Sequence, residues 1–144
     1  SLGAEVRRRI LLGTYFLSEE DGRDCYVRAR RAKTLLRAGF DALFDCYDFL
    51  LPPTPSTTAP LLGAAGNEEA SRLCDSYTVS PNLAGLPALS MPCGFDGLGL
   101  PMGAQLIGPR LGDWAVLTAA HGYQLETNWH RAVPWDRAEK EAGQ

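Results

Sequence analysis

Histidine is the side chain most often used for acid–base chemistry near neutral pH, and this chain contains two histidines, His121 and His130. His121 lies in an apolar helical pattern, where we expect a packed core residue, and His130 lies in a polar stretch, where we expect a surface residue. Neither residue belongs to a Ser-His-Asp order or to a metal-ligand spacing. The histidines therefore predict neither a hydrolytic triad nor a metal centre.

Two charged residues beside apolar sequence suit a different kind of site. Arg9 precedes "ILLGTY", and Asp75 precedes the uncharged stretch "SYTVSPNLAGLPALSMP". A guanidinium binds an α-carboxylate through two hydrogen bonds, and a carboxylate accepts hydrogen bonds from an α-ammonium group. If both residues face one cavity, they can hold a free amino acid. The spacing leaves open the alternative that both are partly exposed surface charges.

The cysteines and glycines do not predict a disulfide, a metal site or a phosphate loop. Cys25, Cys46, Cys74 and Cys93 show no close pairing. If Cys25 and Cys46 share one helix, they lie roughly 30 Å apart, which is too far for a disulfide. We expect buried free thiols. The segment "GFDGLGLPMG" lacks the lysine and hydroxyl of a phosphate-binding loop.

Two helices are predicted in the first third of the chain. "AEVRRRILLGTY" reads as a helix that Gly13 ends or bends, and Ser18 with Asp21 resembles a capping box. Apolar residues then recur every three or four positions, which predicts one long helix over residues 19–46. Its opposite face carries five cations, and a solvated face is favoured over an RNA contact because no aromatic residues interleave with them. These cations are Arg28, Arg30, Arg31, Lys33 and Arg37.

The rest of the chain alternates strands and helices, which indicates an α/β protein. A buried strand over residues 48–51 should end at Pro52, and a proline- and threonine-rich loop should follow. "GNEEASRLCDSYTV" predicts a weak helix, and "PNLAG" a turn or short helix. "PALSMPCGF" and "LPMGAQLIG" predict two strands, either a hairpin or neighbours in a larger sheet. A final helix over residues 113–127 places four bulky residues on one face, namely Trp114, Leu117, His121 and Leu125.

Length, composition and charge limit the class of protein. The 144 residues fit one domain, and the formal net charge of −3 does not favour nucleic-acid binding by the chain as a whole, although residues 1–37 are locally basic. No apolar run approaches the roughly 20 residues of a membrane span, and we find no secretory leader. Because the sequence opens at Ser1 in what reads as the middle of an element, we expect a piece of a longer chain.

Three stretches, in order, resemble one known family. "VRRRILLGTYFLS", "DFLLPPTPSTTAP" and "SYTVSPNLAGLPALSMPCGF", the last continued by "GLPMGAQLIG", are similar to the C-terminal part of the amidase signature family. The resemblance extends from about residue 5 to residue 129. Within the family, "RRRILLGTY" and the aspartate before "SYTVSPNLAGLP" are most similar to the A subunits of the aspartyl/glutamyl-tRNA amidotransferases.

The resemblance implies the C-terminal part of an α/β/α fold with a mixed sheet, incomplete in this chain. Residues 1–130 would be the amidase fragment, and residues 131–144 a polar tail. The family hydrolyses amides with a Ser–cis-Ser–Lys triad in an upstream Gly/Ser-rich segment. This chain has no Gly-Gly-Ser-Ser run, and its lysines are Lys33 and Lys140. We therefore expect no catalytic residue here and no amidase activity from this chain alone.

What the resemblance does carry over is substrate recognition. Arg9 matches the family's second arginine before Ile-x-Leu-Gly-Thr, and Asp75 matches its aspartate before Asn-Leu-Ala-Gly-Leu-Pro; in the family these hold the carboxylate and amine of glutamine. Arg8 is the alternative if the helix is rotated. The prolines and glycines after Asp75 would bend the chain around a small, nearly uncharged pocket, with Asn82 helping to fix a turn.

The implied partners belong to a cytoplasmic, tRNA-dependent complex. The intact protein would release ammonia from glutamine or asparagine. A B subunit would use that ammonia, with ATP and Mg, to amidate misacylated tRNA, and a C subunit would join the two. No cofactor and no membrane contact are expected of this segment, and the isolated chain should self-associate. The alternatives are part of another amidase, acting on aryl, acyl or malonyl amides, and a non-catalytic scaffold module.

Overall fold

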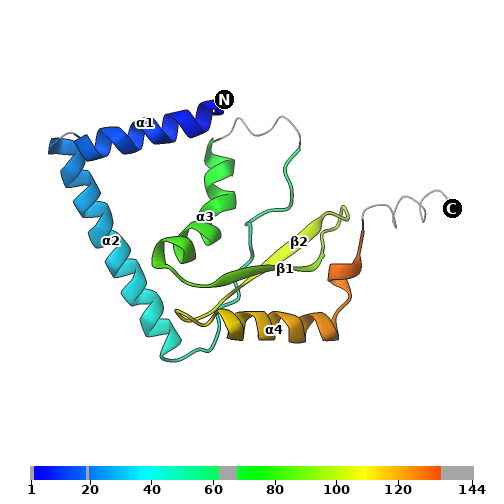
Figure 1. Cartoon of the computed structure of the whole chain (residues 1–144). Helices are drawn as coiled ribbons and strands as arrows, with labels where there is room; N and C mark the ends of the chain where they lie inside the picture. Colours follow the sequence, from blue (N-terminus) through cyan, green and yellow to red (C-terminus); the bar gives the residue numbers. More distant parts are fainter. Residues whose placement is uncertain (1, 19, 62–67, 134–144) are drawn as a thin grey trace.

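The computed structural model describes residues 2–18, 20–61 and 68–133, and it confirms a mixed α/β chain (Figure 1). Four helices, a two-stranded sheet and a short 3-10 turn follow one another. In order these are α1 (Ala4–Ser18), α2 (Glu20–Phe44), α3 (Glu68–Ala84), β1 (Ala88–Phe95), β2 (Pro101–Ile107), α4 (Asp113–Glu126) and η2 (Trp129–Arg131). The predicted boundary between residues 130 and 131 falls inside η2, and most of the tail lies outside the described residues.

The two N-terminal helices meet at a tight corner. Helix α1 passes through Gly13 and ends at Ser18, which rules out the first of the two alternatives, an end at Gly13 or a bend there. One interior glycine costs only about 1 kcal/mol. The Ser18 hydroxyl donates to the carbonyl oxygen of Tyr15 at 3.2 Å, within α1. Gly22 is buried at the start of α2, where an added Cβ would lie 2.8 Å from the Cα of Phe16. A side chain at position 22 would therefore force the corner open.

Helix α3 is longer than the sequence suggested. It continues through Pro81 and includes Asn82, so the predicted helix and the predicted turn are one element. Its end is a Schellman motif: the amide of Leu86 donates to the Pro81 carbonyl oxygen at 3.0 Å, and Gly85 has the positive φ of 74° that this ending favours. The Asn82 side chain donates to the Thr78 carbonyl oxygen at 2.7 Å and so supports the last turn of α3.

Strands β1 and β2 form an antiparallel hairpin, which settles the choice that the sequence left open. Ala88 pairs with Ile107 and Phe95 pairs with Pro101 at the two ends of the register. The register shifts between Pro92 and Gly94, so Cys93 occupies a bulge.

A third extended segment lies on the free edge of β2. The amide of Leu50 donates to the Ile107 carbonyl oxygen at 2.9 Å, and the amide of Thr54 donates to the Gly103 carbonyl oxygen at 2.8 Å. The carbonyl oxygen of Pro52 accepts from the amide of Gln105 at 2.8 Å. The extended segment thus continues through both prolines to residue 54, and the expected end at Leu51 is wrong. Prolines are tolerated because this is an edge segment.

Helix α4 packs on the hairpin with small and branched side chains. The core consists of Met91, Leu106, Val116 and Ala120. Gly108 permits the close approach, since an added Cβ there would collide with the side chain of Val116. The face predicted to be apolar and buried points to solvent instead, because the hairpin covers the narrower Val116 and Ala120 side. Trp114 is 81% exposed and Leu125 is 72% exposed.

The remaining predictions about side-chain burial are mixed. His121 is exposed on α4 and is not a core residue, whereas His130 is on the surface as expected. Cys25 and Cys46 are free but exposed, and Cys93 is free and half-buried. The side chain of Cys74 lies outside what the structure describes.

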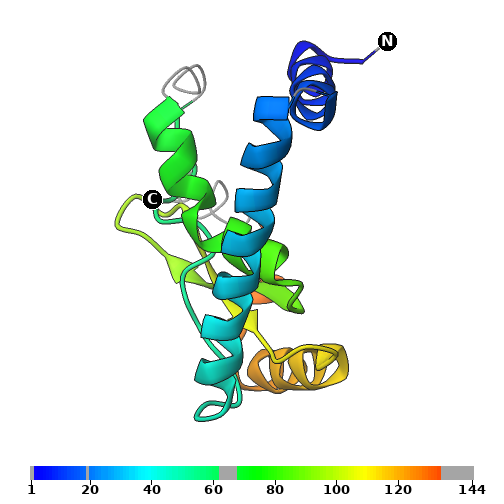
Figure 2. The same ribbon diagram turned by 90° about the vertical axis from the view of Figure 1, so that its left-hand side faces the viewer.

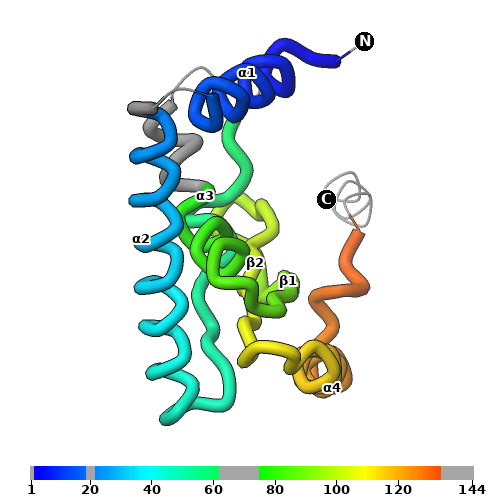
Figure 3. Tube along the Cα trace, turned by 60° about the vertical axis from the view of Figure 1, so that its left-hand side comes forward, coloured from blue at the N-terminus to red at the C-terminus, as the bar shows by residue number. Residues whose placement is uncertain are grey.

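The overall arrangement is open. Figures 1 and 3 show α2 along one edge of the molecule, with α4 beneath the hairpin. Figure 2 views the molecule from that edge and shows α2 in front, beside α3. None of the helices in residues 2–18, 20–61 and 68–133 combines the length and the apolar composition that a membrane span requires.

Candidate functional site

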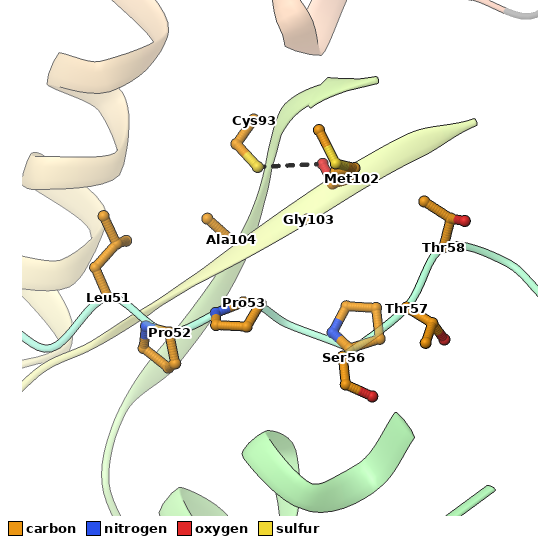
Figure 4. Close-up of a pocket in the computed structure, with 11 residues that line it drawn as sticks. Leu51, Pro52, Pro53, Ser56, Thr57, Thr58, Cys93, Met102, Gly103 and Ala104 are labelled. Atoms are coloured by element: carbon orange, nitrogen blue, oxygen red, sulfur yellow. Dashed lines mark hydrogen bonds between the residues drawn. The ribbon is translucent and has the colours of Figure 1, made fainter. Parts of the chain in front are cut away.

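Among the described residues, a cleft lies between the proline-rich segment and the sheet (Figure 4). It has a volume of about 450 Å³, and apolar side chains dominate its walls. Its lining residues come from three stretches: Leu51–Pro53 with Pro55–Thr58, Cys93 in the bulge of β1, and Met102–Ala104 in β2. The residues that line this cleft are uncharged, and its prolines belong to residues 52–55 and not to the stretch after Asp75.

A glycine in the middle strand lets two hydroxyl groups meet across it. The Thr54 and Ser90 hydroxyl oxygens are 2.8 Å apart and flank Gly103 of β2. An added Cβ on Gly103 would lie 3.1 Å from the Thr54 hydroxyl oxygen and 3.4 Å from that of Ser90. This contact fixes the proline-rich segment against the hairpin and so sets the width of the cleft.

Asp96 makes a second connection between the proline-rich segment and the hairpin. One of its carboxylate oxygens accepts from the amides of Leu98 and Leu100 at 2.9 and 2.8 Å. The other accepts from the Thr58 hydroxyl at 2.9 Å. These hydrogen bonds, above all that from Leu100, hold the pKa of Asp96 below its ordinary value. The hairpin turn and the proline-rich segment are therefore joined through one ionised side chain.

The chemistry available inside the cleft is limited. The Cys93 thiol donates to the carbonyl oxygen of Met102 at 3.5 Å (Figure 4). No histidine, lysine or carboxylate lines the cleft to act as a base for this thiol or for the hydroxyls of Ser56, Thr57 and Thr58. Within the described residues there is also no group of three His, Cys, Asp or Glu side chains that could hold a metal ion. The arrangement is suited to binding rather than to nucleophilic chemistry.

The structure places Arg9 on the exposed side of α1. Its side chain is 77% exposed, and its Nε donates to Glu5 at 2.9 Å. Arg8 uses two nitrogens on the same carboxylate, at 2.8 and 2.9 Å. The Arg8 hydrogen bond, followed by that of Arg9, lowers the pKa of Glu5 to about 2. Glu5 thus orients both arginines that the sequence offered for carboxylate binding.

Asp75 lies on α3 and is exposed. Its backbone carbonyl oxygen accepts a hydrogen bond from the Thr78 hydroxyl at 3.2 Å. No hydrogen bond or ion pair joins Asp75 to Arg9, both of which are described residues, and neither lines the cleft. The amino-acid clamp therefore stays a prediction.

Gln105 is a structural residue that sequence reasoning missed. It is buried on β2, and its side-chain nitrogen donates to the carbonyl oxygen of Tyr77 at 3.0 Å. In an unbroken helix that carbonyl would accept from the amide four residues later, but position 81 is a proline and has no amide hydrogen. Gln105 supplies the missing donor and fixes the part of α3 next to Asp75. The only signal in the sequence is a proline four residues after Tyr77.

An open α/β fragment with a small binding cleft has clear counterparts among known proteins. Residues 1–117 match the family model described as Amidase. The A subunit of glutamyl-tRNA(Gln) amidotransferase from Microcystis aeruginosa is 46% identical over 92% of this chain and 28% of that protein. The protein of the same name from Neisseria meningitidis serogroup C (strain 053442) is 44% identical over 92% of this chain and 27% of that protein.

Solved structures agree. The A subunit of glutamyl-tRNA(Gln) amidotransferase from Thermotoga maritima shares 37% identity at a TM-score of 0.62, over 78% of this chain and 25% of that one. A structure described as an amidase shares 27% identity at a TM-score of 0.69, over 87% of this chain and 29% of that one. The chain belongs to the amidase family. It spans little more than a quarter of the length of the curated relatives it matches.

Proposed function

We propose that this chain is the C-terminal, substrate-pocket part of the glutamine amidase subunit of a tRNA-dependent amidotransferase. The observation that carries the proposal is 46% identity over 92% of the chain to a protein bearing that name. In this proposal the intact protein releases ammonia from glutamine or asparagine. A partner B subunit uses the ammonia, with ATP and Mg, to amidate misacylated tRNA in the cytoplasm, and a C subunit holds the two together.

The residues assigned to glutamine are Arg9 and Asp75. Arg9 would bind the α-carboxylate, and Asp75 would accept from the α-ammonium. The exposure of both residues supports this, because a ligand can reach them without displacing core side chains. Glu5 supports the assignment of Arg9 by holding its guanidinium in one orientation. The Ser–cis-Ser–Lys triad would come from the upstream part of the domain, so this segment contributes recognition and no catalytic group.

The test is glutaminase kinetics in the intact protein, with this segment joined to its upstream part. We expect Arg9→Ala or Asp75→Ala to raise the KM for glutamine about 10- to 150-fold, because each removes a charge-assisted contact to a bound ion. Arg7→Ala is the matched control and should leave KM unchanged. Arg8→Ala should act much less than Arg9→Ala.

Three outcomes would count against the assignment. Equal effects at Arg8 and Arg9 would show that Arg8 shares in binding the α-carboxylate of glutamine. Unchanged KM in all variants would remove the clamp and favour another amidase, acting on an aryl, acyl or malonyl amide without an amino-acid clamp. Lack of hydrolytic activity in the intact protein would favour a scaffold role.

A further inference from the structure

Three neighbouring side chains on α1 form one ion-paired group. Glu5 lies one turn before Arg8 and Arg9, so its carboxylate can reach both guanidinium groups. Arg8 donates from Nε to the Oε2 atom of Glu5 at 2.8 Å and from Nη2 to Oε1 at 2.9 Å. Arg9 donates from Nε to the same Oε1 atom at 2.9 Å. We call these three residues the Glu5 group.

The two arginines of the group differ in the donors that they have left. A guanidinium can bind a carboxylate through Nε and one terminal nitrogen, or through its two terminal nitrogens. In Arg8 the first of these pairs is already used on Glu5. Among the described residues Arg9 makes a single hydrogen bond, from Nε, so both of its terminal nitrogens keep their donors. Arg9 is thus held at Nε while its terminal nitrogens can accept a ligand.

The charge of the Glu5 group also favours Arg9. Two guanidinium groups and one ionised carboxylate sum to +1, which matches one bound carboxylate. The Arg9 side chain is 77% exposed, against 63% for Arg8, so an anion from solvent reaches Arg9 more easily. The hydrogen bonds from Arg8 and Arg9 lower the pKa of Glu5 to about 2. The group therefore keeps its charge over the whole pH range of an ordinary enzyme assay.

We propose that Glu5 is a positioning residue that makes Arg9, and not Arg8, the partner of the substrate's α-carboxylate. Glu5 occupies one donor pair of Arg8, and it fixes the Arg9 guanidinium by a hydrogen bond that leaves the terminal nitrogens available. Because Arg9 is oriented before the substrate arrives, less side-chain entropy is lost on binding. The inference rests on the proposed function, since it takes an α-amino acid amide as the substrate.

Charge alone predicts the opposite effect of Glu5, so the direction of the change is informative. If Glu5 acted only as a counter-charge, its neutralisation would raise the charge of the group from +1 to +2 and tighten carboxylate binding. All three side chains are more than half exposed, so water and salt screen that attraction. The loss of a fixed orientation is not screened in this way. We therefore expect neutralisation of Glu5 to weaken glutamine binding.

The experiment is glutaminase kinetics in the intact protein, with Glu5→Gln as the test variant. The KM for glutamine should rise about 3- to 10-fold, the range expected when one long side chain must be ordered on binding, with kcat almost unchanged. Glu126→Gln removes an exposed carboxylate from α4 and is the matched control, with an unchanged KM.

A second substrate distinguishes positioning from a general structural effect. 4-Aminobutanamide has the same reacting amide and the same amine as glutamine but lacks the α-carboxylate. The ratio of kcat/KM for glutamine to kcat/KM for 4-aminobutanamide should fall about 3- to 10-fold in Glu5→Gln, because only glutamine uses the Arg9 contact. A structural defect would lower both values together and leave the ratio unchanged.

Further variants measure the exchange between the two arginines. In the Glu5→Gln background, Arg9→Ala should raise KM by a smaller factor than in the parent, because Arg8 is then released to bind the α-carboxylate. Glu5→Asp keeps the charge on a shorter side chain and should fall between the parent and Glu5→Gln. Melting temperatures from circular dichroism identify a variant that fails to fold, and Glu5→Asp carries the test if Glu5→Gln is such a variant.

The inference is overturned if Arg9→Ala raises KM while Glu5→Gln leaves KM unchanged or lowers it. It is also overturned if Glu5→Gln impairs both substrates equally, or if Arg9→Ala has the same effect in both backgrounds. If Arg9→Ala has no effect in the parent, the glutamine clamp of the proposed function fails first, and Glu5 has no arginine to position. The two proposals therefore fail with different results.

Discussion

At the scale of single residues, the closest packing constraint is Gly108. A Cβ at this position would collide with Val116, which is 2% exposed in the core between α4 and β2. We expect Gly108→Ala to lower the free energy of unfolding by about 1–3 kcal/mol, the usual cost of overpacking, as measured by urea denaturation. Gly122→Ala is the control, since a Cβ there meets nothing within 4 Å.

The collision can be tested by relieving it. In the double variant Gly108→Ala/Val116→Ala the clash is gone, so the double variant should be less destabilised than the sum of the two single variants. Additive losses would mean that the close approach is not what makes Gly108 necessary.

A second prediction at the scale of single residues concerns the stability of the fold at low pH. The pKa of Asp96 is lower in the folded chain than its ordinary value of 3.8, chiefly because of the hydrogen bond from Leu100. Ionised Asp96 therefore stabilises the fold above that ordinary value, and this stabilisation is lost as the pH falls through the lower folded pKa. Asp96→Asn should melt at a lower temperature than the parent at neutral pH, and the gap should narrow below about pH 4.

Thermal melts across this pH range, followed by circular dichroism, measure the effect. Asp48→Asn removes an exposed carboxylate that has no part in the hairpin turn, and it should leave the neutral melting temperature almost unchanged. A gap between the parent and Asp96→Asn that stays constant on acidification would contradict the role given to the carboxylate.

At the scale of elements, the junction of α3 with β2 depends on one side chain. Gln105 donates to the Tyr77 carbonyl that Pro81 leaves without an amide partner. Gln105→Leu should therefore cost about 1–3 kcal/mol of stability, because it leaves a buried acceptor unsatisfied. Gln124→Leu, at an exposed glutamine on α4, is the matched control and should be near neutral.

The mechanism predicts a specific rescue. Pro81→Ala restores an amide hydrogen at position 81, so Gln105→Leu should cost less in that background than in the parent. Urea denaturation of the four proteins gives the coupling energy. A cost that is independent of residue 81 would refute the donor-replacement explanation.

The same elements show what the sequence could and could not predict. The period of apolar residues located α2 and α4 to within about two residues, and the proline-bounded runs located β1 and β2. Local rules failed at prolines. Pro81 lies inside a helix, where the Gln105 side chain donates to the Tyr77 carbonyl oxygen that position 81 cannot serve. Pro52 lies inside an extended ladder, where its carbonyl oxygen accepts from the backbone amide of Gln105. Such tertiary compensation leaves no local signal.

The candidate site is predictable from sequence only in its residue types. Charge beside apolar sequence selects Arg9 and Asp75, and the structure places both on the surface without joining them. Thr54, Ser90 and Asp96 escape sequence reasoning because their importance comes from contacts between residues far apart in the chain. On α4 the bulky side chains predict the wrong buried side, because close packing against the hairpin selects small and branched side chains instead.

At the scale of the whole molecule, large apolar side chains of the described residues stand in solvent. Trp114 and Leu125 on α4 are 81% and 72% exposed, and Leu11 on α1 is 71% exposed. Exposed apolar patches of more than a few hundred Å² mark interaction sites in soluble proteins.

We therefore expect the isolated chain to be a dimer or larger oligomer at micromolar concentration. Size exclusion with light scattering measures this directly. Trp114→Glu/Leu125→Glu should shift the distribution toward monomer, since it places charges on the most exposed apolar side of α4. Arg110→Glu, which adds negative charge beside the apolar face, is the control. A monodisperse 15.6 kDa monomer that melts cooperatively would show that the segment is self-sufficient.

The two tryptophans of the described chain also make it an optical probe of its own surfaces. Trp114 stands in solvent on α4, whereas Trp129 of η2 lies edge-on to Phe95, with ring centroids 5.9 Å apart. An indole in water emits at longer wavelength than one shielded by protein. Any partner that covers α4 would shift the Trp114 emission to the blue, and detachment of η2 from the end of β1 would shift the Trp129 emission to the red. Assembly through α4 and loosening of η2 would therefore shift the tryptophan emission maximum in opposite directions.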